Sequence, residues 1–310
     1  MRRGIQRSQH FGDPKAFADL SLQLGIFLRA LAIYVEAEQR LQESLDGYVT
    51  LGERHNQGKA QNRLAFLQRL RGQLVDAERF ANQALAILGA NDDERALSYA
   101  ILGTIAYDQL DWSAAAARYT QALTIYEEND NSNMAARVLA DLAIVQGKLG
   151  EYEKATATFE QALALLDGLN LPVQAAVTRM NMGALYLEIS QPAQALILYN
   201  RAEPVLRAVY DLRRVAYILS NQGIAYRDLD QLELSIQTLE EAIPYAQQTA
   251  NYDLLVNTYD ELGLSYRKSG REACAQTAFH QALIWLEQIE SLPVRGHYGK
   301  IIADHVRTEL

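Results

Sequence analysis

A pattern of small and large apolar residues returns along this chain about every forty residues. A small residue, a large residue four positions later and a second small residue three positions after that first appear as Ala37, Leu41 and Ser44. The pattern then begins again at Ala77, Ala115, Ala155, Ala195, Ser235 and Ala275. The step is forty residues except between Ala77 and Ala115, where it is 38, which predicts that one connection is two residues shorter. Seven repeating units over roughly residues 18–290 are therefore expected.

A second small residue precedes each of these patterns by twelve positions. The seven residues are Gly25, Ala65, Gly103, Ala143, Gly183, Gly223 and Gly263. Turn signals lie between the two markers, including LRGQ at 70–73, QLDW at 109–112, KLGEY at 148–152, KSGRE at 268–272 and Pro192. Large residues at helical spacing form one apolar stripe per helix, and small residues on it let two helices approach closely. Each unit is thus predicted to be a helical hairpin, and the protein to be all-α.

The two ends of the repeat region are less regular. The first unit has no turn residue near Leu31 and Ala32, which leaves fused helices or a shifted boundary as alternatives. Asp13 and Pro14 suit the N-cap and first position of an opening helix. The tail after Pro293 leaves the repeat pattern, and its last part is predicted to be an amphipathic helix. The expected organisation is an N-terminal extension at 1–13, stacked hairpins at 14–291 and a capping helix at 292–310, with neither end a linker to another domain.

The sequence pattern L-G-x2-Y followed by A-x3-F-x2-A resembles that of tetratricopeptide repeats. The resemblance covers nearly nine-tenths of the chain. Because the usual unit has about 34 residues, the surplus is expected to lengthen the second helix and its connection, as at 122–133. Units of this length resemble those of kinesin light chains, spindle-orientation adaptors and bacterial regulatory proteins. The resemblance implies a right-handed superhelical α-solenoid, in which the first helix of each hairpin lines a concave groove that binds another protein or a peptide.

Two stretches of similar sequence place an asparagine before the small residue of the first helix. They are MNMGALY at 180–186 and SNQGIAY at 220–226, so Asn181 and Asn221 occupy equivalent positions on neighbouring first helices. An amide side chain offers both a donor and an acceptor, and the resemblance implies that these two clamp the backbone of a ligand. Capping of a neighbouring group, or simple solvation, is the alternative. The equivalent residues elsewhere are Gln23, Arg63, Ile101, Asp141 and Glu261, so a continuous asparagine ladder is absent.

Charged and aromatic residues share the predicted groove face. The candidate peptide-binding residues besides the two asparagines are Arg137, Lys148, Tyr217, Arg227, Arg267 and Lys268. Because arginine presents forked donors that match a carboxylate, we expect a partner segment with acidic residues or a free C-terminus. The alternative is that these cations pair with acidic residues of neighbouring repeats, such as Glu188, Asp228 and Asp260.

The composition excludes several classes of function. The chain has 310 residues, a net charge of −9 and one cysteine, so no internal disulfide forms and a cytoplasmic location is expected. The negative charge disfavours nucleic acid as a partner, and no apolar run is long enough for a membrane. Cys274, beside the small marker Ala275, is expected to be buried.

Motifs for catalysis, cofactors or metals are also missing from the sequence. There is neither a phosphate-binding loop nor a nucleophile elbow, and the five histidines are scattered. The sequence therefore predicts a non-catalytic scaffold without a cofactor. A regulatory sensor that binds a small signalling peptide or a metabolite is the alternative, and the oligomeric state is not predicted.

Overall fold

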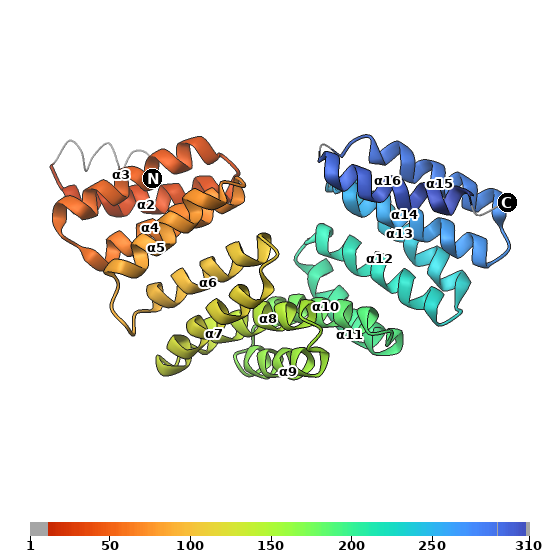
Figure 1. Cartoon of the computed structure of the whole chain (residues 1–310), viewed down its shortest axis with the longest axis horizontal. Coiled ribbons are helices and arrows are strands. Elements are labelled where there is room, and N and C mark those ends of the chain that lie inside the picture. Colours follow the sequence, from red (N-terminus) through yellow and green to blue (C-terminus); the bar gives the residue numbers. More distant parts are fainter. Residues whose placement is uncertain (1–11, 290, 308–310) are drawn as a thin grey trace. The chain divides into compact units, whose positions relative to one another are not determined.

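The computed structural model describes residues 12–289 and 291–307, and this part of the chain contains helices and no strand (Figure 1). The A helices, which come first in each hairpin, are α2 (Pro14–Ala30), α4 (Arg54–Leu70), α6 (Asp93–Asp108), α8 (Ser132–Lys148), α10 (Pro172–Glu188), α12 (Leu212–Asp228) and α14 (Tyr252–Lys268). The B helices, which come second, are α3 (Tyr34–Leu51), α5 (Leu74–Ile87), α7 (Trp112–Glu128), α9 (Tyr152–Gly168), α11 (Pro192–Ala208), α13 (Leu232–Gln248) and α15 (Glu272–Leu286). A last helix, α16 (Leu292–Arg307), follows.

The chain divides into two compact units, one ending at Leu165 and one beginning at Leu166, within α9. In the first unit, α2 packs on α3, and each following helix up to α8 packs on the one before it. In the second unit the same holds from α10 to α16, and α12 also contacts the A helices on both sides of it, α10 and α14. Each unit is therefore a stack of helical hairpins, and the predicted α-solenoid fold is confirmed.

The forty-residue period has a simple structural basis. From α7 to α14 every helix has 17 residues. The connections between these helices have three residues each, for example 209–211 and 229–231. Because A and B helices are equally long, the expectation that the surplus lengthens the second helix and its connection was wrong.

The shorter step between the second and third units also has a different origin from the one predicted. The connection between α5 and α6 spans five residues, 88–92, and is longer, not shorter, than the three-residue connections between α7 and α14. The shortening lies in the helices instead, because α5 has 14 residues and α6 has 16. In the first unit, α2 ends at Ala30 and α3 begins at Tyr34, so the alternative of fused helices is excluded.

The middle residue of most connections adopts the left-handed conformation that ends a helix. Gly72, Gly150 and Gly270 do so with φ of 74°, 77° and 78°, as their turn signals predict. Leu110 and Tyr210 adopt the same conformation with φ of 63° and 56°. The register of the repeat thus forces a conformation that glycine tolerates and other residues adopt at a cost.

The small markers of the A helices lie directly against the large residues of the B helices. A Cβ atom added to Gly183 would lie 2.6 Å from Cε1 of Tyr199, and one added to Gly103 would lie 2.9 Å from Cδ1 of Tyr119. Both tyrosines are buried, and Tyr199 has no exposed surface. The predicted close approach of the two helices in a hairpin is therefore confirmed.

The ends of the described chain carry caps. The Asp13 carboxylate accepts a hydrogen bond of 2.9 Å from the backbone N–H of Ala16, and Pro14 is the first residue of α2. The last helix, α16, begins forty residues after α14 and keeps the step of an A helix, although the tail was expected to leave the pattern. Ile302 of this helix is fully buried beside Phe279. Most of the predicted extension at 1–13 lies outside the described residues, as do residues 308–310.

Two further expectations can be compared with the structure. Cys274 is exposed, because in α15 it points away from the face that buries Ala275, so its predicted burial was wrong. Among the described residues, no helix combines the length and the apolar character that crossing a bilayer requires.

Candidate functional site

The A helices of the second unit form two lines of contact, which we call the α10–α12 seam and the α12–α14 seam. An open hollow of about 450 Å³, the seam hollow, lies at the α10–α12 seam. Its lining residues are Met180 and Asn181 of α10, Asp211, Arg213, Arg214 and Tyr217 at or near the start of α12, and Asn251 before α14. Tyr217 is 37% exposed and Asn181 is partly buried. The structure thus brings together two of the predicted binding residues, Asn181 and Tyr217.

Asn221 has a different environment from its equivalent Asn181. Its side chain is buried, and it does not line the seam hollow. Neither its Nδ2 atom nor the hydroxyl of the neighbouring Tyr199 makes a well-formed hydrogen bond within the described part of the chain. Burial raises the pKa of the Tyr199 hydroxyl well above its usual value, which keeps it neutral. Asn221 is therefore a buried polar residue beside the hairpin core, whereas only Asn181 has access to the hollow.

Arg227 and Lys268 are engaged within the second unit. Arg227 forms an ion pair with Glu261 of α14, and both side chains are largely buried, with 16% and 17% exposed. Burial raises the pKa of the Glu261 carboxyl, and Arg227 acts in the opposite direction. Lys268 Nζ lies 3.1 Å from Asp230 Oδ1 and donates a hydrogen bond to the carbonyl oxygen of Arg227. Both cations thus have partners within the chain.

Arg267 is held by the end of the stack. Its guanidinium donates to Glu272 at 2.9 Å and to the carbonyl oxygen of His305 in α16 at 2.7 Å. It also lies over the ring of Phe279, 4.8 Å from the centroid. For Arg227, Arg267 and Lys268, the alternative of pairing within the protein therefore describes the structure.

Arg137 and Lys148 belong to α8 in the first unit. Arg137 is exposed, and its Nη1 atom lies 3.7 Å from the sulfur of Met134. The Asp141 carboxyl, one turn further along, is accessible to water but surrounded by protein. This desolvation raises its pKa to about 6, and the charges of Arg137 and Arg69 oppose the shift. This face of the first unit therefore carries both signs of charge.

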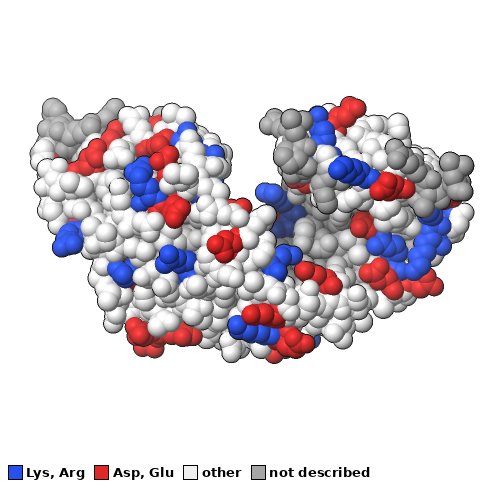
Figure 2. Space-filling view, in the orientation of Figure 1, with Lys and Arg blue, Asp and Glu red and all other residues white. Residues whose placement is uncertain are grey.

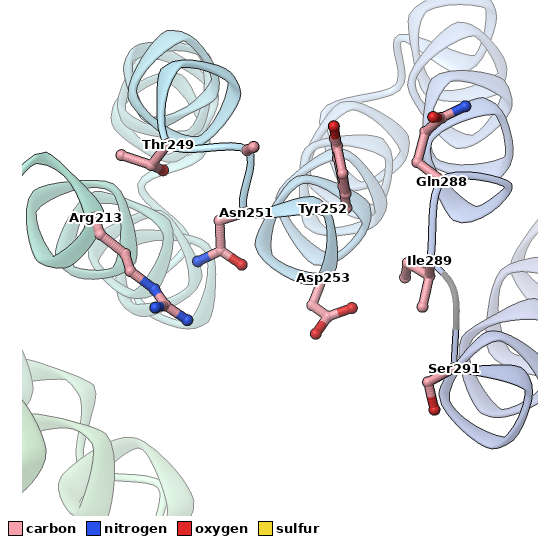
Figure 3. Close-up of a pocket in the computed structure, with 9 residues that line it drawn as sticks. Arg213, Thr249, Asn251, Tyr252, Asp253, Gln288, Ile289 and Ser291 are labelled. Atoms are coloured by element: carbon pink, nitrogen blue, oxygen red, sulfur yellow. The ribbon is translucent and has the colours of Figure 1, made fainter. Parts of the chain in front are cut away.

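A second hollow, the edge hollow, lies at the starts of α12, α14 and α16 and has a volume of about 410 Å³ (Figure 3). Its lining residues are Arg213, Thr249, Ala250, Asn251, Tyr252, Asp253, Gln288, Ile289 and Ser291. Arg213 and Asn251 also line the seam hollow. Arg213 is not among the binding residues predicted from the sequence. It lies one turn before Tyr217, so extending the predicted face of α12 by one turn would have found it.

Neither the surface distribution of charge nor a cluster of metal-binding side chains indicates another site among the described residues. Figure 2 shows Lys and Arg side chains interspersed with Asp and Glu over the visible surface, without a large area of one sign. No group of three or more His, Cys, Asp or Glu side chains that could hold a metal ion occurs among the described residues.

Comparison with known proteins identifies the repeats. The model of the tetratricopeptide repeat family matches residues 93–168. No curated protein sequence matches the chain. The chain is similar in structure to a signal transduction ATPase with numerous domains (STAND) from Pyrococcus horikoshii that has a tetratricopeptide repeat sensor, with 18% identity and a TM-score of 0.75. This match covers 94% of our chain but 44% of the ATPase, so the chain spans less than half of that protein.

Two further solved structures extend over most of the chain. The apo form of RapI is 14% identical, with a TM-score of 0.69 over 88% of our chain and 98% of RapI. Aspartyl phosphate phosphatase F from Bacillus subtilis is 12% identical, with a TM-score of 0.68 over 89% of our chain and 71% of the phosphatase. At these identities the likeness concerns the fold alone. Residues 93–168 therefore match tetratricopeptide repeats in sequence, and the stacked hairpins of the described chain share the fold of these solved structures.

Proposed function

We propose that the A-helix face of the second unit binds an extended or helical segment of another protein in the seam hollow. Tetratricopeptide repeats generally form non-catalytic modules for protein–protein interaction. The observation that carries the proposal is that Asn181 and Tyr217, from neighbouring A helices, line one open hollow. Neither side chain forms a hydrogen bond within the described residues, so the Asn181 amide is available to the backbone of a ligand. The Tyr217 ring supplies an adjacent contact surface.

The chemical preference for the partner follows from which charges are free. Arg227, Arg267 and Lys268 each form an ion pair with one of the protein's own carboxylates, so they add little attraction for an acidic segment. Recognition of the partner's backbone by Asn181 is therefore the main element of the proposal. A preference for acidic residues or a free C-terminus remains a prediction. The cytoplasmic location also remains a prediction.

Regulation by a small ligand is the second candidate function. The hollow is of the size that holds a peptide side chain or a small molecule. The similarity to RapI and to a protein with a repeat sensor favours this candidate only through the shared fold. In this version the chain senses a small peptide or metabolite and changes the state of a partner.

The test is a selection of peptides from a displayed random library on the whole chain, followed by calorimetry with the synthetic peptides. Asn181→Ala and Tyr217→Ala should each weaken binding by about 1–2 kcal/mol, or roughly 5–30-fold. Gln237→Ala, an exposed amide on α13, is the matched control and should leave the affinity unchanged. Failure to select any peptide, or equal binding by Asn181→Ala, would contradict the proposal.

A further inference from the structure

Two opposite charges face the edge hollow without forming an ion pair. Arg213 and Asp253 occupy equivalent positions, forty residues apart, on the neighbouring helices α12 and α14. In Figure 3 the Arg213 side chain extends from α12 toward the start of α14, where Asn251 and Asp253 lie. Within the described chain, neither the guanidinium nor the Asp253 carboxylate forms a hydrogen bond or an ion pair.

This open arrangement differs from the other arginine–carboxylate pairs that join neighbouring hairpins. Arg71 is bound to Glu38, Arg271 to Glu233 and Arg227 to Glu261, and Arg207 Nη2 lies 3.0 Å from Glu241. In each of these, the two side chains close directly on each other. Arg213 and Asp253 are both exposed and both line the edge hollow, so a ligand in the hollow can reach the two charges.

The remaining lining residues suit a small polar ligand. Asn251 caps α14 through Oδ1, which accepts a hydrogen bond from the backbone N–H of Leu254, so its amide NH₂ group is left to donate. Gln288 offers a second amide, and no hydrogen bond within the described residues occupies it. Tyr252 forms a firm wall because its ring stacks on Trp285, with centroids 5.9 Å apart and planes 17° apart. The volume of about 410 Å³ lies in the range of small-molecule sites.

We propose that the edge hollow binds a zwitterion, a ligand with one carboxylate and one ammonium group. The carboxylate binds the Arg213 guanidinium in its forked geometry, and the ammonium group binds the Asp253 carboxylate. A ligand with one charge would leave the other protein charge unpaired. Free α-amino acids and short peptides with both ends free share this chemistry. Asn181 and Tyr217 do not line the edge hollow, so the inference does not depend on the function proposed for the seam hollow.

Thermal unfolding of the whole chain tests this inference, with each standard L-amino acid and with glycylglycine and alanylglycine as separate probes. A ligand that binds the native state raises the unfolding temperature. We expect at least one probe to do so, and its N-acetylated and C-amidated derivatives to bind about tenfold more weakly or worse. Stabilisation by amino acids would identify the free compound as the ligand class. Stabilisation by the dipeptides alone would identify a chain with both ends free.

The variants separate this site from its neighbour. Arg213→Gln and Asp253→Asn should each weaken the effective probe about tenfold or more, because each removes one charge-assisted contact. Arg201→Gln, an exposed arginine of α11 outside both hollows, and Asn181→Ala should bind it as the wild type does. The unfolding temperature without ligand shows whether each variant is folded. The inference is overturned if no probe stabilises the chain, if the blocked derivatives bind equally well, or if Arg213→Gln retains full affinity.

Discussion

The two seams of the second unit are built from equivalent positions but have different polar contacts. The α12–α14 seam is closed by the Arg227–Glu261 ion pair, by a hydrogen bond of 3.1 Å from Thr258 Oγ1 to Ser220 Oγ, and by Lys268 on the carbonyl of Arg227. At the α10–α12 seam, neither Asn181 nor Tyr217 makes a hydrogen bond across the helices within the described residues, and a hollow lies there instead.

One pair of positions illustrates the difference in polar contacts. Arg227 lies four residues after the small marker of α12, and Glu261 lies two residues before that of α14. At the α10–α12 seam the equivalent residues are Leu187 and Asn221, which cannot form an ion pair. The apolar pattern therefore builds the same hairpins throughout, while the residues at this pair of positions decide whether an ion pair joins the two A helices.

The largest expected loss of stability comes from removing the ion pair of the α12–α14 seam. Arg227→Met keeps most of the side-chain volume but leaves the buried Glu261 carboxylate without its counter-charge. We expect the second unit to lose about 2–4 kcal/mol of unfolding free energy near pH 7. Urea unfolding followed by the fluorescence of Trp285, in a Trp112→Phe background, measures the second unit alone.

The open seam supplies the control for this experiment. Asn181→Ala removes a side chain that has no partner across the seam, so the unfolding free energy should change by less than about 0.5 kcal/mol. If Arg227→Met and Asn181→Ala unfold at the same urea concentration, the two seams do not differ as described.

The loss of unfolding free energy caused by Arg227→Met should depend on pH, which sharpens the comparison of the two seams. The pKa of Glu261 in the folded state lies above its unfolded value of 4.5, so the folded state binds the carboxyl proton more tightly than the unfolded state does. The unfolding free energy therefore falls as the pH rises from the unfolded pKa to the folded pKa. Removing Arg227 raises the folded pKa further. The loss of unfolding free energy should therefore be larger near pH 8 than near pH 5. In Arg227→Met/Glu261→Gln the loss should vary less with pH, because only Asp260 still responds to the missing charge. A flat profile for the single variant would contradict the assignment.

The fold could be predicted from the sequence because its determinants are local and repeated. Each small marker and its large partner lie within one hairpin, as Gly183 and Tyr199 do, so their spacing alone predicts the contact. The division of the forty residues into equal helices was missed, because non-glycine residues such as Tyr210 terminate helices without a sequence signal.

The candidate site was only partly predictable, because its contacts join different repeats. The position of Asn181 on the A-helix face follows from the repeat pattern, and so does its proximity to Tyr217. Whether Arg227 is free depends on a residue 34 positions away, Glu261, and Asn221 is buried although its repeat position matches that of Asn181. Neither outcome is determined by the residue itself.

Replacing the small glycine marker of an A helix with alanine should cause a moderate loss of stability. The loss should be the same beside both seams, because the hairpins there are packed alike. In Gly183→Ala the new Cβ would meet the ring of Tyr199, which has no space to move. Overpacking costs about 1–3 kcal/mol, and the higher helix propensity of alanine offsets up to about 1 kcal/mol of this cost. We therefore expect a net loss of about 1–2 kcal/mol of unfolding free energy. Gly263→Ala, against Phe279, should cost a similar amount. Gly168→Ala, with no atom within 4 Å, should not destabilise the second unit, and a loss there comparable to Gly183→Ala would argue against a packing origin.

The smallest effect tests whether backbone strain contributes to the open seam. Tyr210 is 83% exposed and adopts a φ of 56° two residues before the start of α12, so its side chain adds strain without packing. The left-handed conformation costs a non-glycine residue about 1–2 kcal/mol, and the greater freedom of glycine in the unfolded chain offsets part of that. Tyr210→Gly should therefore raise the unfolding free energy of the second unit by about 0.5–1 kcal/mol. Peptide binding at Asn181 should be unchanged, because the open seam results from its side chains; a change in affinity would mean that strain at residue 210 helps to hold the hollow open.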